Sequence, residues 1–90
     1  MQIVQTRNFK NSVKKLHHNQ KECLDLAIKE IIHNPAVGQQ KKGDLAGLRV
    51  HKFNMINQLM LLGYSFSSDT ITLTLIGVGS HENFYMDLKH

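Results

Sequence analysis

The sequence contains a single cysteine, Cys23, among its 90 residues. One cysteine cannot form an intramolecular disulfide, so a disulfide framework is excluded, and such usage is typical of the reducing cytoplasm. No run of about 18 apolar residues occurs, which excludes a membrane-spanning helix and argues against a membrane partner. The first residues, up to Thr6, are too few and too polar for a secretory signal peptide. We therefore expect a soluble cytoplasmic protein.

Two common kinds of ligand site are also missing from the sequence. The glycines do not form the G-x-x-x-x-G-K-[ST] pattern of a phosphate-binding loop. Cys23 and the nearest histidines do not form a closed set of zinc ligands, so we expect neither a bound metal nor a cofactor. Cys23 is then expected to be a small core residue.

The composition is that of a small basic globular domain. Hydrophobic residues make up 41% of the chain, which suits one modest core in a single domain spanning residues 1–90. Eleven lysines and arginines stand against seven acidic residues, with six histidines besides. This balance favours an anionic partner, either nucleic acid or an acidic protein.

Helical periodicity occupies the first third of the chain. The break at His18-Asn19 predicts either a helical hairpin or one bent helix, and Asn34-Pro35 ends the helical region because a residue before proline disfavours helical geometry. Asn8 is the candidate N-cap of the first helix. That helix is indicated by Phe9, Val13 and Leu16. The second has apolar residues with helical spacing at Leu24, Ala27, Ile28, Ile31 and Ile32.

The pattern changes to strands after Pro35. Residues 35–47 hold three glycines and two lysines and are interpreted as a basic loop. The strand predicted over residues 48–53 places Leu48 and Val50 on one face and Arg49 and His51 on the other.

Two further strands are predicted beyond this one. Residues 59–66 are almost continuously apolar, as in a central strand buried on both faces. Residues 70–78 alternate threonine with aliphatic residues, and the segment 81–90 forms a short extension. The first five residues also have strand character and are expected to join the sheet, since a lone strand leaves its backbone unsatisfied. The order β-α-α-β-β-β predicts an α+β fold with two N-terminal helices packed on a small antiparallel sheet.

Three segments resemble motifs of the RelE/ParE toxin family. They are Lys-Lys-Gly-Asp-Leu-Ala-Gly-Leu-Arg-Val at 41–50, Gly-Ser-His-Glu-Asn-Phe-Tyr at 79–85, and Asn34-Pro35 before the basic loop. They occur in the family's order and spacing over nearly the whole chain. The resemblance implies a RelE-like fold and the toxin of a type II toxin–antitoxin system, neutralised by a cognate antitoxin protein.

The resemblance leaves the target of the toxin open. Many RelE-like members are mRNA endonucleases that work in the ribosomal A site, whereas ParE relatives poison DNA gyrase and other members have no established target. A third hypothesis is a regulatory member that chiefly binds its antitoxin. Fold alone does not choose between them.

Metal-free RNA cleavage needs a group that takes a proton from the 2′-hydroxyl, a group that protonates the leaving 5′-oxygen, and positive charge for the phosphorane. A histidine followed four residues later by an aromatic residue resembles the active-site pattern of RelE-like nucleases that use histidine, which implies that His81 and Tyr85 are catalytic. Lys52 lies near the position of a catalytic basic group in such relatives, and Arg49 is the expected phosphate clamp.

RNA- or phosphate-binding roles are expected for Lys41, Lys42, His51 and Gln58. Gln58 departs from the RelE pattern, which has arginine at this place, and an amide cannot neutralise a phosphate.

Each candidate also has a structural alternative. Arg49 could form a salt bridge with Asp44 or Asp87, His81 could cap the terminal segment, and Tyr85 could pack in the core. Lys41 and Lys42 could simply be solvated, and His51 could be an exposed strand residue. The remaining internal histidines, His17, His18 and His33, are expected on the surface.

Overall fold

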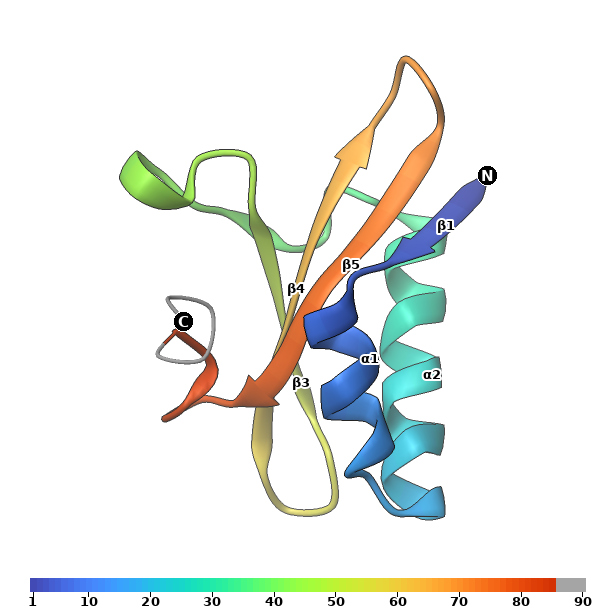
Figure 1. Cartoon of the computed structure of the whole chain (residues 1–90), viewed down its shortest axis with the longest axis vertical. Coiled ribbons are helices and arrows are strands. Elements are labelled where there is room, and N and C mark those ends of the chain that lie inside the picture. Colours follow the sequence, from blue (N-terminus) through green and yellow to red (C-terminus); the bar gives the residue numbers. More distant parts are fainter. Residues whose placement is uncertain (86–90) are drawn as a thin grey trace.

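The computed structural model, which describes residues 1–85, has two helices packed against one face of a five-stranded sheet (Figure 1). The α+β class and the presence of two helices in the first third of the chain agree with the sequence-based prediction. The predicted position of the break between them was wrong, because α1 ends at Lys14 and His18-Asn19 already belong to α2. The elements in chain order are β1 (Gln2–Gln5), α1 (Arg7–Lys14), α2 (His18–His33), β2 (Gln39–Gln40), the 3-10 helix η1 (Gly43–Leu45), β3 (Arg49–Asn54), β4 (Leu59–Ser67) and β5 (Thr72–Ser80).

The sheet is mixed, so the prediction of an antiparallel sheet was wrong in part. Strands β3, β4 and β5 form the expected antiparallel meander, and the full order is β1-β5-β4-β3-β2. Strand β1 does join the sheet, but it runs parallel to β5, with Gln2 opposite Thr72. The direction of this pairing is set by how the helices return the chain to the sheet, and an alternating pattern carries no information about it.

A second difference lies in the segment predicted as a loop. Gln39 and Gln40 form strand β2, which pairs with β3 at Val50 and Arg49. Two residues are too few to show a strand period in the sequence. The rest of the segment closes on itself, because the backbone amide of Lys41 donates to the carbonyl of Leu48 at 2.9 Å.

Local side-chain bonds fix the start and end of the helices. Thr6 is the N-cap of α1, and its hydroxyl accepts a 3.1 Å hydrogen bond from the amide of Phe9. The prediction of Asn8 as N-cap was therefore wrong, and Asn8 lies inside the first turn. Threonine also suits this position because its hydroxyl reaches an otherwise unpaired amide. At the C-terminal end of α2, the side chain of Asn34 accepts from the amide of Ala36 at 3.2 Å, which turns the chain at Pro35.

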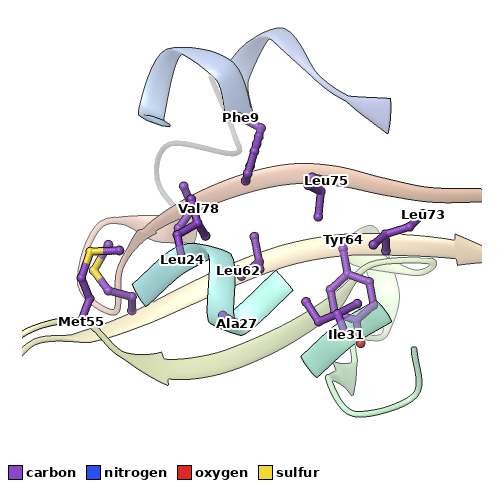
Figure 2. Close-up of a cluster of buried hydrophobic side chains, with 11 residues drawn as sticks. Phe9, Leu24, Ala27, Ile31, Met55, Leu62, Tyr64, Leu73, Leu75 and Val78 are labelled. Atoms are coloured by element: carbon purple, nitrogen blue, oxygen red, sulfur yellow. The ribbon is translucent and has the colours of Figure 1, made fainter. Parts of the chain in front are cut away.

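Two hydrophobic cores lie on opposite faces of the sheet. Because successive residues of a strand point to opposite faces, β4 supplies Leu62 to one core and Leu61 to the other, as its apolar sequence predicted. The second core is covered by residues 81–85, which Figure 1 shows on the side of the sheet away from the helices. The helix-side core, drawn in Figure 2, includes Phe9, Leu24, Ala27, Ile31, Met55, Leu62, Tyr64, Leu73, Leu75 and Val78. The second core contains Leu48, Val50, Leu61 and Phe84, with Leu45, Ile76 and Tyr85 packed beside it.

Neither of the helices in residues 1–85 is long and apolar enough to cross a membrane.

Candidate functional site

The face of the sheet opposite the helices, here called the open face, carries part of the predicted site. Its centre is the core around Leu61 and Phe84. Lys52 shares a face with Val50 by strand alternation, and its side chain is exposed. Tyr85 follows Phe84 at the margin of this core. The open face therefore brings a basic residue of β3 and the predicted aromatic residue to the same side of the sheet.

Tyr85 and Lys41 form a direct pair on this side. The ammonium nitrogen of Lys41 lies 5.5 Å from the centroid of the Tyr85 ring, within the range of a cation–π contact. The ring of Tyr85 packs edge-on against Phe84, with centroids 5.0 Å apart and an interplanar angle of 87°. Tyr85 thus packs against the core, as in its structural alternative, and also lies beside the ammonium group of Lys41.

His81 and Gln58 meet in a separate polar hollow of about 320 Å³. The hollow lies where the β3–β4 turn approaches the end of β5, and the amide of His81 donates to the carbonyl of Leu59 at 3.1 Å. The His81 side chain is exposed. The other lining residues are Asn57, Leu59, Ser80 and Glu82.

Arg49 lies on the helix side of β3, and its guanidinium donates hydrogen bonds to backbone carbonyls. Its Nη1 donates to the carbonyl oxygen of Gly38 at 2.8 Å and to that of Ala36 at 3.4 Å. These bonds, rather than the Asp44 salt bridge considered from the sequence, hold the guanidinium, while Asp87 lies outside the described residues. Arg49 thereby stabilises the segment between α2 and β2.

His51 also faces the helices. Its side chain is only 10% exposed, and Nε2 lies 3.1 Å from a carboxylate oxygen of Glu30 on α2. The alternative of an exposed strand residue was wrong, and the contact links β3 to α2 across the helix-side core. Lys42, by contrast, is exposed just before η1.

Tyr64 was not singled out in the sequence, yet it organises the same loop. Its hydroxyl donates to the carbonyl of Pro35 at 2.7 Å and accepts from the amide of Gly38 at 2.9 Å. Burial raises the pKa of Tyr64 above its ordinary value of 10.0, while the Gly38 hydrogen bond and the charge of Arg49 act in the opposite direction. The only available indication was a hydroxyl-bearing residue inside the apolar run 59–66.

Sequence reasoning also missed Asn57, Ser80 and Glu82, which complete the hollow beside His81. Their closeness to Gln58 and His81 in the chain was the available indication. The spatial meeting of the two segments depends on the pairing of β4 with β5.

Comparison with known proteins gives the family and the fold. A family model described as the ParE-like toxin of type II bacterial toxin–antitoxin systems matches residues 3–89. Among curated proteins, none matches the sequence of this chain.

Solved structures with a similar fold include three toxins at low sequence identity. The Mycobacterium tuberculosis RelBE2 toxin–antitoxin complex contains a chain with TM-score 0.74 and 17% identity, covering 89% of this chain and 96% of that one. The YoeB/ParE toxin from Agrobacterium tumefaciens has TM-score 0.71 and 19% identity, and the match covers 90% of this chain and 99% of that one. A chain of the intact Escherichia coli RelBE complex has TM-score 0.70 and 16% identity, and the match covers 88% of this chain and 94% of that one. At these identities the likeness shows the fold.

Proposed function

Because the chain belongs to the ParE-like toxins of type II bacterial toxin–antitoxin systems, we propose that it arrests growth as a metal-free mRNA endonuclease acting on ribosome-bound message. His81 is the catalytic histidine of this proposal. The observation that carries it is the exposed imidazole in a polar hollow, four residues before an aromatic ring that is paired with a lysine. Histidine suits both proton-transfer steps of RNA cleavage near neutral pH.

The remaining roles are assigned from the charge of each side chain and from the resemblance of the His81–Tyr85 motif to RelE-like nucleases. Lys41 and Lys52 would stabilise the negative charge that develops on the phosphorane, with Lys42 adding to the attraction of the RNA backbone. The ring of Tyr85 would stack on an unpaired base or share in proton transfer. Gln58, in the hollow with His81, would hydrogen-bond a phosphate oxygen.

Two of the residues chosen from the sequence take supporting roles in this proposal. Arg49 acts through the carbonyls that it holds, and His51 acts through the Glu30 contact. Neither directs its polar end to the open face, so the phosphate charge is assigned to the lysines.

The test is to induce the protein in cells and map mRNA 5′ ends over the first minutes. We expect new cuts in translated messages, reduced by roughly 100-fold or more in His81→Ala, as for loss of a general acid or base. His18→Ala is the matched control, since His18 is exposed on α2 and lies 3.0 Å from Glu22 one turn along the same helix. A His81→Ala protein that remains fully toxic would rule out this mechanism.

A second candidate function is inhibition of DNA gyrase without nuclease activity, and the description of the matching family as ParE-like favours it. In that case induction would cause DNA-damage signalling before translation stops, with mRNA intact. A chain that causes no growth effect would instead be a regulatory member that chiefly binds its antitoxin.

The structures of RelBE and RelBE2 are toxin–antitoxin complexes, and we propose that this chain likewise binds a cognate antitoxin. One suitable surface is the hollow beside α2 that Leu26, Lys29, Glu30, His33 and Val37 line, where Leu26 and Val37 are 61% and 41% exposed. The apolar side of an amphipathic antitoxin segment would match these exposed apolar groups. Leu26→Glu should prevent growth rescue by the co-expressed antitoxin while toxicity persists, and unchanged rescue would exclude this surface.

A further inference from the structure

The tip of the β3–β4 hairpin has an unfavourable backbone conformation beside His81. Met55 and Gln58 exchange backbone hydrogen bonds of 2.8 and 3.2 Å, which leaves Ile56 and Asn57 as a two-residue loop. Both are in the left-handed region, with φ of 47° and 65°. Hairpin loops of this type favour asparagine and glycine, and a β-branched residue rarely adopts such a φ. Strain of this kind is concentrated at functional sites.

The hollow at this tip is held by the sheet on both sides. Its first wall is the hairpin end, Asn57, Gln58 and Leu59, and its second is the end of β5 with Ser80, His81 and Glu82. The walls are joined by the pairing of Met60 with Ser80 and by the amide of His81 donating to the carbonyl of Leu59. The six residues of the two walls therefore line one hollow, and the strand pairing holds the walls together.

These residues offer hydrogen-bonding groups of the kind that can distinguish one nucleobase from another. The ionised carboxylate of Glu82 only accepts hydrogen bonds, whereas the amides of Asn57 and Gln58 both donate and accept. Guanine presents two adjacent N–H donors, N1–H and N2–H, next to the acceptor O6. A carboxylate can take both donors while an amide N–H reaches O6. Uracil places a carbonyl on each side of its single N–H, so the carboxylate repels it.

We propose that this hollow is a guanine-binding subsite, in which Glu82 accepts from the base and Asn57 or Gln58 donates to it. Leu59, which is 41% exposed, supplies apolar contact to the face of the ring. The biological meaning rests on the proposed ribonuclease function, since His81 lines the same hollow. Cuts would then fall beside guanines.

The direct test uses the wild-type protein and the four nucleoside monophosphates, GMP, AMP, CMP and UMP, in separate NMR titrations of isotope-labelled chain. We expect GMP to shift the backbone amides of residues 57–59 and 80–82 and to bind about tenfold more tightly than UMP, as for one bidentate base contact. Glu82→Gln should lower GMP affinity by about the same factor without weakening UMP. Glu22→Gln, which changes an exposed carboxylate on α2, should leave all four titrations unchanged.

The outcomes separate this inference from the proposed function. Equal or absent shifts for the four nucleotides would overturn the guanine subsite, even in a protein that cuts mRNA. Preferential GMP binding in the hollow by a protein that leaves mRNA intact would support the subsite and contradict the ribonuclease. If both hold, the mapped cuts should lie beside guanine, and this bias should be lost in Glu82→Gln.

Discussion

The hydroxyl of Tyr64 donates a 2.7 Å hydrogen bond to the carbonyl oxygen of Pro35, so the central strand of the sheet holds the chain where it leaves α2. The same hydroxyl accepts from the amide of Gly38, and a Cβ added at Gly38 would lie 2.7 Å from it. The loop therefore depends on a phenol in one protonation state and on the absence of a side chain at residue 38.

The hydrogen bonds of Tyr64 should make the free energy of unfolding change with pH in the alkaline range. Burial raises the pKa of Tyr64 above 10.0 in the folded chain. The folded state keeps its proton at pH values where the unfolded state has lost it, so the stabilisation is complete below about pH 10 and declines as the pH rises through the folded pKa. Tyr64→Phe should cost about 1–3 kcal/mol near neutral pH, because Gly38 and Pro35 lose their partner. The stability gap to wild type should narrow at about pH 11.

Urea unfolding at both pH values measures this effect. Tyr85→Phe is the control and should keep the alkaline decline of the wild-type chain. A constant gap between wild type and Tyr64→Phe across this range would show that Tyr64 is not linked to stability in this way.

The Glu30–His51 contact between α2 and β3 should contribute more to stability than the Glu22–His18 contact within α2. Glu30→Ala leaves the buried Nε2 of His51 without its partner, and we expect a loss of about 1–2 kcal/mol in the free energy of unfolding. Glu22→Ala removes a contact of similar length, but His18 is 90% exposed, so the expected change is below about 0.5 kcal/mol. Chemical denaturation near neutral pH compares them. Equal losses would contradict a structural role for His51.

The absence of a side chain at Gly63 should be required for Phe84 to pack on the open face. A Cβ at this position would lie 2.7 Å from Cζ of Phe84 and 3.2 Å from Cδ1 of Leu48. Gly63→Ala should therefore destabilise the chain by about 1–3 kcal/mol through overpacking. In Phe84→Leu the ring end is absent, so the same change should cost less. A double-mutant cycle measures this coupling, and additive losses would show that Phe84 does not pack over Gly63.

Much of the local structure follows from the order of residue types. The apolar spacing of Leu24, Ala27 and Ile31 defines the buried side of α2, and the apolar run of β4 identifies a strand covered on both faces. Alternation also separates Val50 from Arg49 and His51 correctly. These features are set by the fixed periods of helices and strands, which appear directly in the sequence.

The residues of the candidate site could be predicted only in part from the order of residue types. The motif around His81 and Tyr85 directed attention to the terminal segment, and the charge pattern directed it to Lys41 and Lys52. The sequence could not show that the guanidinium of Arg49 donates to the carbonyl of Gly38, or that His51 contacts Glu30. Those partners lie 11 and 21 residues away in the chain, so only the packed fold brings them into contact.

Two helices, a three-stranded meander, a basic composition and the family motifs can all be recognised in the order of the residues. The parallel pairing of β1 with β5, the Lys41–Tyr85 contact, and the hollow that joins Asn57 and Gln58 to His81 and Glu82 arise only in the packed fold. The difference lies in the range of the interactions. Periodicity and capping act within a few residues, whereas pairing direction and the meeting of polar groups depend on how the whole chain packs.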